Sequence, residues 1–110
     1  MNLPNGARAL VDLVKLREYV LSQTHPRGRH KARVFLSAFG LTAADAEELQ
    51  RALLEAAQNN EAALGEADEF GRRYTIDFEF VFSNKRGRVR SLWIVRADDD
   101  APRLTSCYVL

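Results

Sequence analysis

The residues best suited to chemistry lie together in one short segment, between positions 25 and 33. This segment contains both histidines of the chain and four of its sixteen lysines and arginines, namely His25, Arg27, Arg29, His30, Lys31 and Arg33. Cleavage of RNA without a metal ion needs a base for the ribose 2′-hydroxyl, an acid for the leaving 5′-oxygen and a cation near the phosphorus atom. Two histidines can hold a proton acceptor and a proton donor near neutral pH. We therefore predict His25, His30 and Lys31 as catalytic residues.

The same segment also suits an anion. Cations at the start of a helix oppose the positive end of the helix dipole, so helix stability does not explain why they gather there. A phosphate group would explain it, because the first N–H groups of a helix and nearby cationic side chains both favour negative charge. The predicted phosphate-binding residues are Arg27, Gly28, Arg29 and Arg33. The alternative is a solvent-exposed helix face that binds nothing.

Two further groups of residues extend this prediction. Lys85, Arg86, Arg88 and Arg90 form a second basic stretch, which would hold the neighbouring phosphates of a nucleic acid. The alternative is a charged hairpin that keeps a strand edge soluble. Near the end of the chain, Thr105 and Tyr108 complete the predicted catalytic set, and with Ser106 they could orient a phosphate or a ribose. Ordinary strand composition is the alternative for these residues.

Other chemical groups are weaker candidates. The run Asp98-Asp99-Asp100 has no further ligands in a recognisable pattern, which favours a solvated loop over a cation site. Cys107 and Trp93 are predicted core residues. One cysteine and two histidines cannot build a disulfide framework or a zinc cluster, so we expect no metal and no cofactor.

Length and composition describe one globular domain over residues 1–110. The formal net charge of +1 hides a segregation, because residues 1–40 carry a net +5, residues 41–70 a net −7 and residues 71–110 a net +3. The acids of the middle part suit the first turns of a helix. No long apolar run and no signal-peptide pattern is present. We expect a cytoplasmic protein without membrane contact.

Three helices are expected in the first half of the chain. The first follows Asp12 and ends before the turn at Thr24-His25-Pro26. The second runs from about residue 29 to 39 and ends at Gly40, and the third begins at a capping box formed by Thr42 and Asp45. The faces predicted to be buried in the second and third helices consist of Ala32, Phe35, Leu36, Phe39, Ala46, Leu49, Leu53, Ala56 and Ala57. In the second helix, Lys31 lies at the border of the apolar face, and His30 points away from that face.

The period then changes from helical to alternating. Residues 73–82 alternate polar and aromatic side chains and predict one strand, residues 89–96 a second strand buried on both faces at its centre, and residues 104–110 a third that lies inside the sheet. A turn is expected at residues 84–87. The predicted fold class is α+β, with two to three N-terminal helices packed on a three- to four-stranded antiparallel sheet.

The segment His25-Pro26-x-Gly28-x-x-Lys31-Ala32 and the ending Cys107-Tyr108-Val109-Leu110 resemble those of a family of small bacterial proteins of uncharacterised function. The resemblance covers nearly the whole chain. By its layout, that family is similar to the barnase–EndoU–colicin–RelE group of ribonuclease toxins, whose members place N-terminal helices on an antiparallel sheet and often act without a metal. Fold resemblance alone does not confer activity.

Two hypotheses of different classes follow. The first is a small, toxin-like, metal-independent ribonuclease that acts on RNA and is restrained by a small cognate partner, an antitoxin protein. The second is a non-catalytic interaction or nucleic-acid-binding module, in which the basic segment grips an acidic partner or a nucleic acid. Whether the protein is an enzyme is left open by the sequence.

Overall fold

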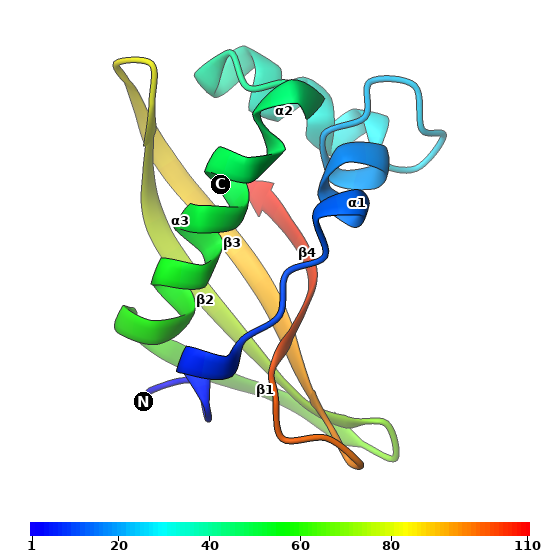
Figure 1. The fold of residues 1–110 in the computed structure, drawn as a ribbon, viewed down its shortest axis with the longest axis vertical. Helices are drawn as coiled ribbons and strands as arrows, with labels where there is room; N and C mark the ends of the chain where they lie inside the picture. Colours follow the sequence, from blue (N-terminus) through cyan, green and yellow to red (C-terminus); the bar gives the residue numbers. More distant parts are fainter.

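A computed structural model describes residues 1–110 as an α+β fold in which the helices precede the sheet (Figure 1). None of the helices is long and apolar enough to span a membrane. The elements in chain order are η1 (Gly6–Arg8), α1 (Leu13–Lys15), η2 (Leu16–Val20), α2 (Arg29–Phe39), η3 (Ala43–Asp45), α3 (Ala46–Asn59), β1 (Ala62–Asp68), β2 (Gly71–Phe82), β3 (Lys85–Arg96) and β4 (Arg103–Val109). The fold class predicted from the sequence is confirmed.

Local signals in the sequence place the helices correctly. The Asp12 carboxylate accepts hydrogen bonds from the N–H groups of the next turn, where α1 passes into the π-helical turn η2. Gly40 ends α2 with a positive φ of 70°, and its N–H donates to Leu36. Thr42 and Asp45 form the predicted capping box. The predicted buried faces are confirmed, except that Leu36 is 41% exposed.

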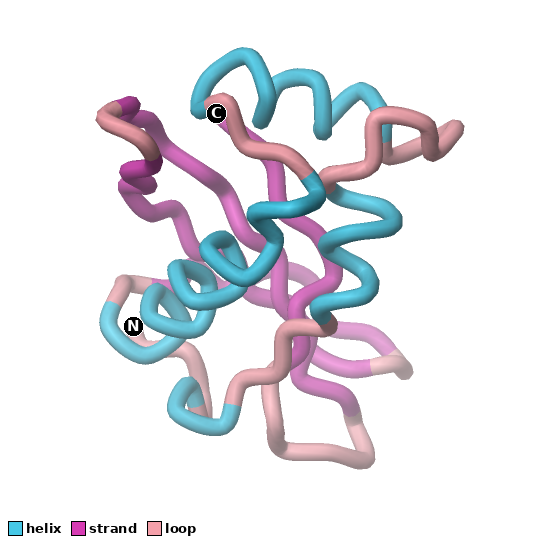
Figure 2. Tube along the Cα trace, turned by 45° about the horizontal axis from the view of Figure 1, so that its top comes forward, coloured by secondary structure: helices cyan, strands magenta, loops and turns pink.

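The four strands form an antiparallel meander in the order β1-β2-β3-β4. The helices all lie on one side of this sheet, as the tube in Figure 2 shows. A two-residue turn joins β2 to β3, because Ser83 and Asn84 both adopt positive φ angles, 51° and 66°. The turn predicted over residues 84–87 is therefore shorter, and β3 begins at Lys85.

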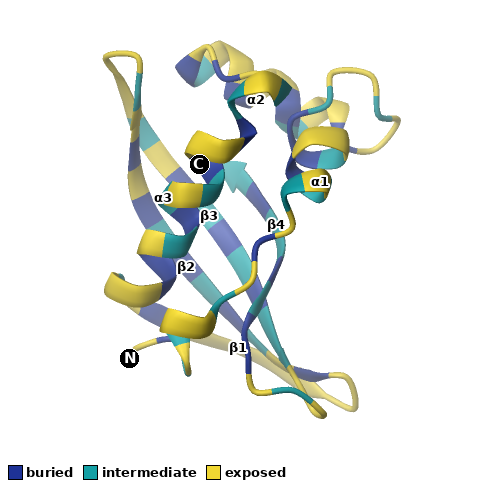
Figure 3. Ribbon diagram, viewed as in Figure 1, coloured by how far each residue is buried: buried dark blue, intermediate teal, exposed yellow.

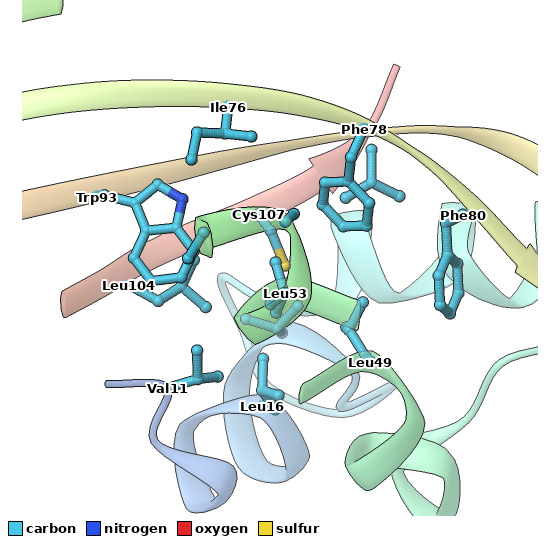
Figure 4. Close-up of a cluster of buried hydrophobic side chains, with 14 of the residues drawn as sticks. Val11, Leu16, Leu49, Leu53, Ile76, Phe78, Phe80, Trp93, Leu104 and Cys107 are labelled. Carbon is cyan, nitrogen blue, oxygen red and sulfur yellow. The ribbon is translucent and has the colours of Figure 1, made fainter. Parts of the chain in front are cut away.

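The core lies between the helices and the covered face of the sheet (Figure 4). Alternate residues of β2 point into it, so that Tyr74, Ile76, Phe78 and Phe80 are buried while the odd-numbered residues between them are not. The indole of Trp93 is 1% exposed and donates its N–H to Ser91, whose hydroxyl in turn donates to the Ile76 carbonyl. These two bonds of 2.8 Å satisfy the polar groups buried at the centre of the sheet.

Two expectations about the sheet are wrong. β4 lies at an edge of the sheet and not inside it, with the backbone of Leu10 and helix α2 packed beside it. The centre of β3 is buried on one face only, because Leu92 and Ile94 are half-buried on the face that no helix covers. Figure 3 shows the resulting alternation of buried and less buried residues along the strands. The sheet therefore has an uncovered face that carries the odd-numbered residues of β2 and the even-numbered residues of β3.

Candidate functional site

The turn before α2 is built by His25. Its ring nitrogen Nδ1 accepts hydrogen bonds from the N–H groups of Arg27 and Gly28, both at 3.0 Å. Its carbonyl accepts a third, from the N–H of Arg29. The ring also contacts Tyr19 edge to face, with 4.6 Å between centroids. The N–H groups of Arg27, Gly28 and Arg29 are thus already used, and these bonds hold the first turn of α2 in place.

Gly28 has a steric reason to be glycine. It is buried, and a Cβ atom at this position would collide with the backbone carbonyl of Tyr19. The close approach lets the turn pack directly on η2, the segment that contains Tyr19. Together with the His25 cap, this contact determines where α2 begins and therefore which way its side chains point.

Lys31 extends from the first turn of α2 to the edge strand of the sheet. Its ammonium group donates to the Ser106 hydroxyl at 3.0 Å and lies 5.6 Å from the centre of the Tyr108 ring, a cation–π distance. None of the ion pairs in the structure includes Lys31. The half-buried ammonium is therefore held by a hydroxyl and an aromatic ring, and its charge is available to an anion.

A β-bulge places these two partners on the same side of the sheet. Leu104 pairs with Trp93 and Ser106 with Leu92, so the register shifts at Thr105, which is left without a pair. With strict alternation from the buried Leu104, Ser106 would face the core. The bulge reverses this order: Cys107 becomes fully buried, and Ser106 and Tyr108 lie on the uncovered face.

A hollow of about 330 Å³ lies beside this contact, between α2 and the end of β4. Its lining residues are His30, Lys31, Val34, Tyr108 and Val109, and we call it the Lys31 hollow. None of these residues is acidic. An exposed imidazole, an ammonium group and a phenol therefore face one small cavity, which is a combination that can accept a proton, hold an anion and donate a proton.

The site continues from Tyr108 onto the neighbouring strands. Arg90 is the partner of Tyr108 across the β3–β4 pair, and its guanidinium binds the Asp77 carboxylate through two bonds of 2.8 Å. The hydrogen bonds from Arg90 hold the pKa of Asp77 below its ordinary value of 3.8, although partial burial opposes this. The pKa of Arg90 is raised, first by Asp77 and then by Tyr108. A row of polar groups thus runs from α2 over β4 and β3 to β2.

The structure brings together three of the five predicted catalytic residues, His30, Lys31 and Tyr108. The other two have structural partners, since His25 Nδ1 caps the turn and the Thr105 hydroxyl donates to the Leu92 carbonyl. Among the predicted phosphate-binding residues, Arg27, Arg29 and Arg33 are exposed on the turn and on α2, and Lys85, Arg86 and Arg88 are exposed on β3. Of these residues only Arg86 forms an ion pair, with Glu79 at 3.6 Å.

Sequence reasoning missed Asp77, which fixes Arg90. The signal was present, because Asp77 lies between the buried Ile76 and Phe78 on the opposite face of the strand, and the short turn pairs it with Arg90. The aspartate run has the structural role of a loop, in which Asp99 binds Arg103 at 2.7 Å. Cys107 is a core residue as predicted, and burial raises the pKa of its thiol to about 12.

Comparisons with known proteins identify a family and no function. Residues 2–110 match the family model DUF6883, which is described as a domain of unknown function. No curated protein matches the chain. The prediction of an uncharacterised family that covers nearly the whole chain is confirmed.

Proposed function

The chain belongs to the DUF6883 family, and we propose that it is a metal-independent endoribonuclease that works at the Lys31 hollow. The observation that carries the proposal is the convergence of His30, Lys31 and Tyr108 on one cavity, with the Lys31 ammonium 3.0 Å from Ser106 and without an acidic partner. A phosphodiester group is the anion whose cleavage uses all three side-chain types.

The proposed reaction is a transesterification within the RNA strand, in which phosphorus exchanges its bond to the 5′-oxygen for a bond to the neighbouring 2′-oxygen. His30 takes the proton of the ribose 2′-hydroxyl, and the 2′-oxygen forms a bond to phosphorus. The bond from phosphorus to the 5′-oxygen breaks, and Tyr108 donates a proton to that leaving oxygen. Lys31 stabilises the additional negative charge on the phosphoryl oxygens between these two events. The products are a 2′,3′-cyclic phosphate and a 5′-hydroxyl end.

His25 has a different part in this proposal. Because its Nδ1 atom already accepts two backbone N–H groups, we assign it as a positioning residue that holds the first turn of α2, where His30 and Lys31 are attached. The toxin-like role belongs to the same proposal. A free ribonuclease would damage the RNA of the cell that makes it, so a small partner protein would cover the hollow until the enzyme is needed.

The test is cleavage of end-labelled RNA by the pure protein in the presence of EDTA. Cleavage with 2′,3′-cyclic phosphate ends supports the proposal, and His30→Ala and Lys31→Met should each reduce the rate by about 10² to 10⁴. Arg8→Met is the matched control, because Arg8 is an exposed cation of η1 that forms no ion pair and lies outside the Lys31 hollow. A rate unchanged by His30→Ala and Lys31→Met would refute the assigned site.

The second candidate function is nucleic-acid binding without cleavage. It is favoured by Arg86, Arg88 and Arg90, which follow one another on the uncovered face and would attract phosphates without taking part in chemistry. The same experiment separates the candidates. RNA that binds to the wild-type protein, remains intact and is still bound by His30→Ala would identify a binding module.

A further inference from the structure

On the uncovered face of the sheet, Arg88 lies between two ion-paired arginines and has no ion pair of its own. Arg86, Arg88 and Arg90 are alternate residues of β3, spaced by about 6.8 Å along the strand. Arg86 pairs with Glu79 at 3.6 Å, and Arg90 pairs with Asp77 at 2.8 Å. Arg88, between them, is exposed and forms no ion pair.

A second hollow, which we call the sheet hollow, adjoins Arg88. It has a volume of about 410 Å³ and is lined by Glu61, Ala62, Ala63, Thr75, Asp77, Arg88 and Arg90. Short side chains, Ala63 and Thr75, leave room between the longer ones. Both carboxylates of the hollow already have partners, since Asp77 binds Arg90 and Glu61 binds the N-terminal amine at 2.8 Å. The remaining positive charge of Arg88 makes the sheet hollow complementary to an anion.

The Lys31 hollow and the sheet hollow are joined by two side chains. Tyr108 lines the first, Arg90 lines the second, and the two residues face each other across the β3–β4 pair. From β4 to β1 the sheet is three strand spacings wide, which is about 14 Å. The result is one polar path, positive at Lys31 and again at Arg88, that crosses the uncovered face.

We infer that this path binds a single strand of RNA, of which about four nucleotides lie on the sheet between the Lys31 hollow and β1. The inference rests on the proposed function, since it extends the substrate outward from the phosphate cleaved at Lys31. Stacked nucleotides of one strand advance by about 3.4 Å each, so about 14 Å holds four of them. An A-form RNA duplex hides its base edges in a deep, narrow major groove, whereas the bases of a single strand can be splayed out onto a protein surface. We therefore expect the path to favour a single strand over a duplex.

The test measures binding apart from cleavage. The probes are fluorescent 2′-O-methyl oligoribonucleotides of two to eight nucleotides, which lack the 2′-hydroxyl that attacks phosphorus, and an eight-base-pair duplex of the same chemistry. The variants are Arg88→Gln and, as a matched control, Arg8→Gln, which removes an exposed arginine of η1 that forms no ion pair and lies outside both hollows. Thermal unfolding confirms that both variants are folded.

Affinity should rise with length up to four or five nucleotides and then level off, and the duplex should bind at least tenfold more weakly. Arg88→Gln should weaken binding of the eight-nucleotide strand about tenfold and lower the salt dependence of log K by about 0.7, while Arg8→Gln changes neither. Equal affinities of the two variants, or a duplex that binds as tightly as the single strand, would overturn the inference even if RNA is cleaved. Length-dependent binding without cleavage would support the inference and contradict the catalytic function alone. Absence of both binding and cleavage would overturn both.

Discussion

Replacement of His25 will show whether this side chain positions the site or takes part in the reaction. The wild-type ring accepts two N–H bonds of 3.0 Å through Nδ1 and contacts Tyr19 with 4.6 Å between ring centres. His25→Ala removes the acceptor and the ring contact together. His25→Asn removes the ring but keeps a side-chain oxygen that can accept the N–H groups of the same turn, as asparagine does in Asx-turns.

The magnitudes follow from these contacts. Loss of a helix-capping acceptor costs about 1 kcal/mol, and loss of an edge-to-face aromatic contact costs about 1 kcal/mol more. The free energy of unfolding should therefore fall by about 2 kcal/mol in His25→Ala and by about 1 kcal/mol in His25→Asn. At roughly 5 °C per kcal/mol for a domain of this size, Tm falls by about 10 °C and about 5 °C. Both losses are smaller than the ordinary stability of a domain, so both variants remain folded at 20 °C.

Circular dichroism melting curves and RNA cleavage at 20 °C measure the two effects on the same samples. His25→Ala should cleave about tenfold more slowly, because a loosened first turn misplaces His30 and Lys31, and His25→Asn should recover most of this loss. If His25→Asn melts as expected but loses cleavage as completely as His30→Ala, His25 acts in the chemistry. If His25→Ala melts like the wild-type protein, the capping role is refuted.

Three further predictions concern stability and reactivity. In urea titrations, Gly28→Ala should lower the free energy of unfolding far more than Gly40→Ala, because a Cβ at Gly28 collides with the Tyr19 carbonyl. A Cβ at Gly40 meets no neighbour, so Gly40→Ala costs only the strain of its positive φ, about 1 kcal/mol. Equal losses of stability would contradict the close approach at Gly28. Burial raises the pKa of Cys107 from 9.0 to about 12. Iodoacetamide at pH 8, followed by mass spectrometry, should therefore alkylate this thiol about 10³-fold more slowly in the folded protein than in urea. Comparable alkylation rates would mean that the thiol is accessible. Arg90 holds the pKa of Asp77 below 3.8, so this pair stabilises the fold above about pH 4, and the stabilisation disappears as the pH falls through the lowered pKa. Between pH 4 and 2 the Tm of the wild-type protein should therefore fall more steeply than that of Asp77→Asn. Parallel Tm curves would show that the pair does not contribute.

Helix positions were predictable because their signals are local. The bounds of α2, its end at Gly40 and the capping box at Thr42 depend on residues within a few positions of one another. The first strand of the sheet had no such signal. Apart from Leu64, β1 consists of small and acidic residues, almost all of its residues are exposed, and it becomes a strand only by pairing with β2. Sequence patterning therefore left the number of strands at three or four.

The errors in the sheet have one physical cause. An apolar run such as that of Leu92 to Val95 shows that a strand is largely buried, but it does not show whether a helix lies on both faces. Here the helices cover one face, and Leu92 and Ile94 are shielded only in part by their neighbours on the other. The position of β4 at the edge has the same origin, because α2 and Leu10 bury an edge strand that the sequence alone would place inside the sheet.

The candidate site depends on two irregular features that connect local sequence to long-range contacts. The cap at His25 and the close approach at Gly28 direct α2 so that Lys31, three residues beyond Gly28, reaches the edge strand. The bulge at Thr105 moves each residue that follows it to the opposite face of the sheet. The ring of Tyr108 therefore lies on the uncovered face, where it contacts the Lys31 ammonium. The cap at His25 stabilises the fold as well as directing α2, whereas a bulge interrupts the strand pairing that stabilises a sheet. The bulge therefore interrupts pairing in β4 at the place where it brings Tyr108 to the Lys31 hollow, so this arrangement costs stability in the strand that supplies the phenol.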